Sequence, residues 1–309
     1  MSHATVSASH TASAEGTIPL GGKWADIVDA LISGGAIRAT TESGGITIEQ
    51  SGSVGDYNLR GEGTIGSVVQ DDLDLRFLFR HWAGGLVHPA HTTVDFIDTT
   101  GAICVSLHAA DDTARATIET VAERFAGPPL EVPAVPAPRP AKADSDVDTD
   151  ALLADWRAMQ NVHHFEAIIG KHGIGRLQAM RLVGSEFARE LSTEAFGALL
   201  DRLDDGTQEI MVFVANRGMV QIYSGPAGNK KRAGHGWEIE SGTSKVYVPD
   251  KALHGLWLVH KPTAAGIITS LEFVREDSDQ SVASIFGRHP HGDAQPPEWL
   301  ALLESLPSA

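Results

Sequence analysis

Short apolar runs separated by Gly, Asn and Asp dominate the chain. The runs EIMVFVA, MVQIYS, SKVYVP, GLWLVH and IITSLEF alternate or stay apolar, as β-strands do. Helical spacing occurs in KWADIVDALI in the first half, and in LLADWRAMQNVHHFEAIIGKHG and RLQAMRLVGSEFAREL in the second. Runs of strands next to runs of helices predict an α+β fold, in which antiparallel sheets are flanked by helices.

A proline-rich segment divides the chain. Six prolines fall between Pro128 and Pro140 and an acidic stretch follows, so residues 127–150 are predicted to be an extended linker. Residues 1–17 are rich in Ser, Ala, Thr and His without periodicity, which predicts a disordered tail. The folded parts are then residues 18–126 and 151–309, and the total length of 309 residues agrees with about two domains.

The two folded parts resemble each other. GGITIEQSG (44–52) and RGMVQIYSG (217–225) have equal length and share Gly, Ser and Gly in register. Each half continues with a Trp, a Val-His pair and a strand: Trp82, Val87-His88 and TTVDFIDTTG in the first, Trp257, Val259-His260 and ITSLEFVRED in the second. These matches predict a tandem structural repeat.

Charge and cysteine content narrow the possible functions. The chain has 24 Lys and Arg against 40 Asp and Glu, a net charge of −16, which disfavours binding to nucleic acid or to anionic membranes. A single cysteine, Cys104, allows neither an intramolecular disulfide nor a thiolate zinc cluster. Since no signal peptide or long apolar stretch is found, we expect a cytoplasmic protein without membrane insertion.

One histidine stands out in the helical segment that opens the second half, whereas P-loop, GxSxG and HExxH signatures are not found, nor is a GxGxxG on a strand-to-helix turn. If the segment is one helix, His163 falls close to one face with apolar residues. Leu152, Trp156 and Met159 precede it at steps of three and four, and Ile169 follows six residues later. A hydrogen-bonded core histidine and an axial ligand of haem iron both agree with this position. His164, about 100° further round such a helix, is the alternative ligand.

Haem carries two propionates, which favour cations at the rim of a pocket. Candidate side chains follow in the second half, although each also agrees with a solvated surface charge: Arg176, Arg181, Lys261 and Arg288 with His289. Two other hypotheses stay open. One is a mononuclear metal site built from His88, His91 and His108, which are loosely spaced. The other is a β-rich scaffold in which all histidines are incidental.

At these residues the sequence resembles the bacterial cytoplasmic haemin-degrading or haemin-transport factors. The resemblance covers about residues 150–295 through WRAMQNVHHF, KHGIGRLQAMRLV, EIMVFVANRGMVQIYSG, WLVHKPTAAGIITSLEF and IFGRHP. In the first half it is weaker and rests on DLDLRFLFRHWAGG and VDFIDTTGAI. The resemblance implies two tandem α+β repeats whose sheets pack centrally, with haem (iron protoporphyrin IX) held between a sheet and helices.

The resemblance also implies roles for particular residues. His163 corresponds to the proximal histidine that binds the iron, and Arg76 to the catalytic arginine on the distal side. Arg176 and Lys261 correspond to contacts of the propionates.

Three positions near the end of the last predicted strand complete the implied site and depart from the family. Phe286 replaces a tyrosine, His289 replaces an arginine, and Arg288 is a possible substitute for that arginine. The N-terminal helical segment is also shortened, and EIESGTSKV after Trp237 replaces an Asn-Pro stretch.

The resemblance implies a haem-binding protein of haem and iron utilisation. In one version it degrades haem and releases iron with an external electron donor. In the alternative it is a chaperone that passes haem to a separate haem oxygenase. The sequence does not separate these two versions.

Overall fold

The structure is a computed structural model that describes residues 16–131, 142–203, 208–275, 280–289 and 293–309. The predicted tail, apart from its last two residues, and the middle of the predicted linker lie outside these ranges. The chain divides into two compact units. Unit 1 comprises residues 1–42, 48–137 and 215–221, and unit 2 comprises residues 43–47, 138–214 and 222–309.

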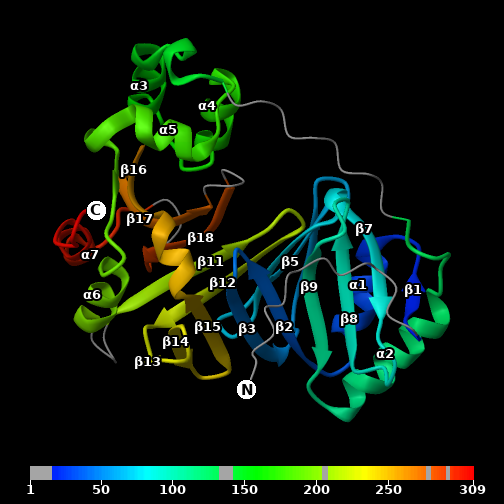
Figure 1. Cartoon of the computed structure of the whole chain (residues 1–309). Helices are drawn as coiled ribbons and strands as arrows, with labels where there is room; N and C mark the ends of the chain where they lie inside the picture. The colour runs from blue at the N-terminus through cyan, green and yellow to red at the C-terminus, as the bar shows by residue number, and fades with distance from the viewer. Residues whose placement is uncertain (1–15, 132–141, 204–207, 276–279, 290–292) are drawn as a thin grey trace. The chain divides into compact units, whose positions relative to one another are not determined.

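The order of elements occurs twice, as the tandem repeat predicts (Figure 1). The first copy runs β1 (Ile18–Leu20), α1 (Trp24–Ile32), β2 (Ala36–Ser43), β3 (Ile46–Ser53), β4 (Tyr57–Arg60), β5 (Ile65–Val69), β6 (Asp74–Leu78), β7 (Trp82–Val87), β8 (Thr93–Asp98), β9 (Ile103–Ala109) and α2 (Asp112–Arg124). The second runs β10 (Ala188–Glu190), α6 (Ala195–Arg202), β11 (Glu209–Ala215), β12 (Met219–Pro226), β13 (Asn229–Arg232), β14 (Gly236–Ser241), β15 (Ser244–Pro249), β16 (Leu256–Thr263), β17 (Gly266–Arg275), β18 (Gln280–Gly287) and α7 (Pro297–Glu304). Between the copies stand α3 (Thr149–Arg157), α4 (His164–His172) and α5 (Arg176–Val183).

The described strands form two antiparallel sheets of nine strands each, which confirms the α+β class. Corresponding strands are neighbours in the same order, β1-β7-β8-β9-β2-β3 in one sheet and β10-β16-β17-β18-β11-β12 in the other. Both copies even carry a register shift at the same place, after Phe96 in β8 and after Phe273 in β17. A shared irregularity of this kind supports duplication of one structural unit.

The shared register shift corrects one detail of the sequence match. Val87 and Leu258 each pair with the residue two positions before the phenylalanine at the shift. Val87 therefore corresponds to Leu258 and not to Val259, so the two Val-His pairs are offset by one residue. Because side chains alternate along a strand, this offset places Val87 and Val259, and likewise His88 and His260, on opposite faces of their sheets.

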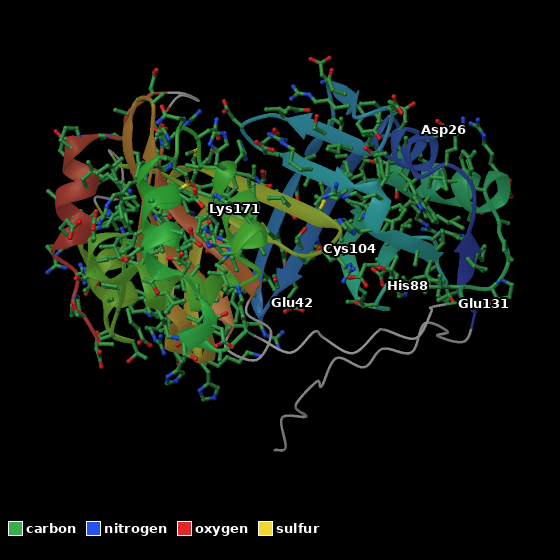
Figure 2. All side chains as sticks on the ribbon, turned by 90° about the horizontal axis from the view of Figure 1, so that it is seen from above. Asp26, Glu42, His88, Cys104, Glu131 and Lys171 are labelled. Atoms are coloured by element: carbon green, nitrogen blue, oxygen red, sulfur yellow. The ribbon has the colours of Figure 1, made fainter. Side chains whose placement is uncertain are left out.

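In unit 1, α1 and α2 cover one face of the sheet (Figure 1). Their apolar residues pack on strand residues that include Phe96 and Val105. The Trp82 ring stacks on Phe96 with centroids 4.2 Å apart. Cys104 is buried in β9 (Figure 2), and burial raises the pKa of its thiol, so the sulfur stays protonated and is a poor ligand.

In unit 2, helices cover both faces of the sheet. The first face receives α3, α4 and α5, whose buried residues pack on Trp257, Val259 and Val274. On the opposite face, Phe196 of α6 meets Phe273 at 5.6 Å, and Trp299 of α7 donates to the Thr269 carbonyl at 3.2 Å. Alternate residues of β17 therefore point toward different helices.

The prediction of one continuous helix across residues 152–172 is wrong. The helix ends at Arg157 and a new one begins at His164. The Asn161 side chain accepts from the His163 amide at 2.9 Å, and the Gln160 carbonyl accepts from the Ala264 amide at 3.1 Å. These bonds replace the backbone pairs that a helix would need.

The second predicted helix is also shorter than expected. It ends at Val183, because Gly184 adopts a left-handed φ of 66° that an L-residue disfavours. The end of RLQAMRLVGSEFAREL forms strand β10 instead.

Candidate haem site

The two candidate iron ligands lie at the start of α4. His163 is the N-cap residue and His164 the first helical residue, and both side chains are accessible to solvent. The apolar stripe that singled out His163 is therefore broken, since Met159 stays in the core while His163 does not. Both imidazoles can be reached by a ligand, so the choice between them stays a prediction.

The helix that carries these histidines is anchored at its other end. Lys171 and His172 both contact the Asp155 carboxylate of α3, with closest distances of 2.7 Å (Lys171 is labelled in Figure 2). These contacts lower the pKa of Asp155, so the carboxylate stays charged. The anchor fixes α4 against α3 and thereby holds the loop between them.

A buried ion cluster lies where α5 meets β16 and β17. Glu272 of β17 accepts from Lys261 of β16 and, at 2.9 Å, from Nη1 of Arg176 at the start of α5. The Glu272 side chain is 1% exposed and that of Lys261 is 7% exposed. Lys261 and Arg176 therefore share one partner. The sequence placed Lys261 at the solvated rim of a pocket, but the structure buries it.

The electrostatics of this cluster follow from burial and mutual attraction. Burial alone raises the pKa of Glu272, but Lys261 and Arg176 outweigh it and lower the value to about 2. Burial also lowers the pKa of Lys261, and the Glu272 carboxylate opposes that change. Ser270 adds a hydrogen bond to the carboxylate at 3.2 Å. Glu272 is thus a firmly charged buried acceptor.

Phe165 connects this cluster to the first turn of α4. The Arg176 guanidinium carbon lies 4.6 Å and the Lys261 Nζ 5.0 Å from the centroid of its ring. The ring packs edge-on against Trp156 at 5.0 Å. Since Phe165 is two residues after His163, the accessible imidazole and the two cations belong to the same local structure.

An apolar strip extends this sheet face across β18 and β11. Phe286 and Phe213 meet edge to face with centroids 5.3 Å apart, and both are half-buried. Glu272 pairs with Ser284, which is two residues before Phe286, so the strip is on the face that bears the ion cluster. A flat apolar ligand with anionic groups is complementary to such a face.

A cavity of about 230 Å³ borders the loop before His163. It is lined by Gln160, Asn161, Val162, Thr263, Ala264, Ala265, Ile268, His289 and Asp293. The His289 ring bonds the Gly287 carbonyl at 2.8 Å. Arg288 is instead exposed and pairs with Glu209 at 3.1 Å. Of these two candidates for the missing family arginine, only His289 lines this cavity.

Arg76, the predicted distal residue, belongs to unit 1. It is half-buried in β6, where Nη1 donates to the Val68 carbonyl at 2.8 Å and the guanidinium pairs with Asp74. Burial raises the pKa of Asp74 to about 6, although the adjacent Arg76 acts in the opposite direction. The guanidinium is therefore engaged within its own hairpin.

The alternative metal site from His88, His91 and His108 is not supported. Within the described ranges, no group of three or more His, Cys, Asp or Glu side chains could hold a metal ion. Two of the rings have other partners: His88 (labelled in Figure 2) bonds Asp95 at 2.7 Å, and His108 bonds Thr93 at 3.0 Å.

Sequence reasoning missed Glu272 and Phe165. A signal for Glu272 was present, because this carboxylate interrupts the apolar run IITSLEFV and a buried charge needs a partner. No comparable signal marked Phe165, since an aromatic residue after two histidines fits any amphipathic helix.

Comparison with known proteins decides the family. The model of the haemin-degrading HemS.ChuX domain matches residues 3–125 and 173–306. The chain belongs to this family. The matched stretches leave out the segment that contains His163, so they do not bear on the choice of ligand.

Individual relatives span most of the chain. It is 26% identical to the hemin transport protein HemS of Yersinia enterocolitica over 88% of this chain and 81% of HemS. The structure of holo-PhuS, a heme-binding protein from Pseudomonas aeruginosa, superimposes with a TM-score of 0.87 at 28% identity, covering 95% of this chain and 87% of PhuS. ChuS, described as an E. coli heme oxygenase, gives a TM-score of 0.80 at 28% identity, covering 94% and 88%. Among the described residues, no helix is long and apolar enough to cross a membrane.

Proposed function

We propose that the chain binds haem on the face of the unit 2 sheet next to α4 and α5, and degrades it to release iron. The observation that supports this is the partly exposed Arg176 guanidinium, held with the buried Lys261 on Glu272, beside a half-buried aromatic strip and an accessible imidazole. Aromatic walls suit the macrocycle, cations suit the propionates, and imidazole is a standard ligand of haem iron.

In this proposal His163 binds the iron and Arg76 acts on the distal side. Arg176 receives a propionate, while Phe286 and His289 contribute to the walls of the pocket. The protein supplies orientation and electrostatics, and the oxidative chemistry belongs to haem itself and an external electron donor. Relatives described as a hemin transport protein, a heme-binding protein and a heme oxygenase support haem as the ligand or substrate. Action in the cytoplasm stays a prediction from the sequence.

A haem chaperone is the second candidate. It is favoured by the two adjacent accessible imidazoles, His163 and His164, because neighbouring ligands could take the iron in turn during transfer. The same pocket would then release intact haem to a separate oxygenase.

Two experiments test the proposal. Titration of the purified chain with haemin should give a saturable Soret change near one equivalent, and a chain that gives none does not have the proposed function. The haem complex is then incubated with ascorbate in the presence of catalase. Loss of the Soret band with release of iron indicates the enzyme, whereas a stable spectrum together with transfer to an added apo-oxygenase indicates the chaperone.

A further inference from the structure

Arg176 is held by two carboxylates in very different environments. Glu272, from β17, is 1% exposed and is shared with Lys261. Glu166, from α4, accepts from the other terminal nitrogen of the guanidinium and is 65% exposed. Both terminal nitrogens of Arg176 thus donate to protein carboxylates.

Replacing Glu272, the buried carboxylate, by a ligand would cost much free energy. Removing one member of a buried ion pair leaves a charge without compensation, and Glu272 balances both Lys261 and Arg176. Lys261 is almost fully buried against Glu272 and the Phe165 ring. It therefore positions Glu272 and is not free to receive a ligand from solvent.

Glu166, the exposed carboxylate, can be replaced by a carboxylate of a ligand. Two cations and one buried carboxylate leave a surplus of one positive charge, which Glu166 neutralises from the surface. Exposed ion pairs are weak, so a second carboxylate can replace Glu166 at little cost. A guanidinium donates to either carboxylate in the same planar geometry.

We propose that Glu166 is an internal competitor that occupies the position of a ligand carboxylate on Arg176 and is displaced when a haem propionate binds. This inference rests on the proposed function and deepens it. It assigns one propionate to Arg176 alone, and it makes Lys261 a positioning residue instead of a propionate contact. Only molecules in which Glu166 has left the guanidinium can bind the propionate there. The apparent affinity for haem is therefore the intrinsic affinity multiplied by the fraction of such molecules.

The test is a haemin titration followed at the Soret band for the full chain and its Glu166→Gln and Glu166→Ala variants. Removal of the competitor should tighten haemin binding about two- to fivefold, the range expected for loss of an exposed ion pair. Haemin dimethyl ester, which has no free carboxylate, should bind all three proteins equally. The matched control is Asp150→Asn, which removes an exposed charge from α3 and should change neither affinity.

The outcomes distinguish failure of the competitor from failure of haem binding itself. Equal or weaker haemin binding by both Glu166 variants overturns the competitor, as does an equal gain for the dimethyl ester or for Asp150→Asn. In those cases haem binding by the wild type still stands. If the wild type itself binds no haemin, the proposed function is overturned and this inference with it.

Discussion

Replacing Glu272 by Gln should strongly destabilise unit 2. The amide keeps the shape of the side chain but removes the negative charge that faces Lys261 and Arg176. Lys261 would then be a buried cation that faces the Phe165 ring and a neutral amide.

The magnitude follows from the ionisation of Glu272. Its pKa falls from 4.5 to about 2 in the folded protein, which corresponds to about 3 kcal/mol of stability. Loss of one partner from a buried ion pair typically costs about 3–5 kcal/mol, so the two considerations agree. Because the folded carboxyl is the stronger acid, this contribution is complete above pH 4.5 and disappears as the pH falls toward 2.

Urea unfolding followed by tryptophan fluorescence measures this effect. At pH 7, Glu272→Gln should lower the free energy of unfolding by about 3 kcal/mol, and the difference from wild type should shrink between about pH 4.5 and pH 2. Glu166→Gln removes the exposed partner of the same arginine and should cost less than about 1 kcal/mol. A loss below about 1 kcal/mol for Glu272→Gln, or a difference that does not vary with pH, would refute this account of the cluster.

Three further predictions concern the ligand, the distal residue and α4. His163→Ala should shift the Soret band and weaken haem retention far more than His164→Ala, and equal effects would show that the wrong imidazole was assigned. Arg76→Ala should leave haem affinity nearly unchanged and slow haem loss under ascorbate, whereas unchanged turnover would remove its distal role. Gly170→Ala should stabilise the chain by about 0.5–1 kcal/mol in urea unfolding, because Gly170 is helical and the added methyl meets nothing within 4 Å apart from the backbone of its own helix and its chain neighbours. A loss of stability there would contradict the described geometry of α4.

Several strands and the repeat could be predicted because they depend on local pattern. Alternating or continuous apolar runs identify β11, β12, β15, β16 and β17, and similar patterns in both halves indicate the repeat. The register of the repeat could not be predicted as well. It depends on shifts after Phe96 and Phe273, and no residue at these positions signals a bulge.

The break before α4 shows why the site was harder to predict than the fold. The residues from Arg157 to His163 are compatible with a helix, and the break depends on a hydrogen bond from Ala264, which is distant in the sequence. The partners of Arg176 and Lys261 come from α4 and β17. Arg176 and Glu272 are 96 residues apart in the sequence, so their contact, and with it the burial of Lys261, could not be predicted from spacing.

The two halves differ in the partners of one buried acidic residue. Asp95 in β8 and Glu272 in β17 both directly precede the phenylalanine at the register shift, so each half retains an acid there. In unit 1 this acid is satisfied by His88 and Ser106, which are neutral or weakly basic groups. In unit 2 it is paired with two cations, Lys261 of β16 and Arg176 of α5. A truncated chain without α5 would leave Glu272 paired with Lys261 alone and would expose Trp257 and Val259 to water. Such a chain would therefore misfold, and would not simply lose the ability to bind haem.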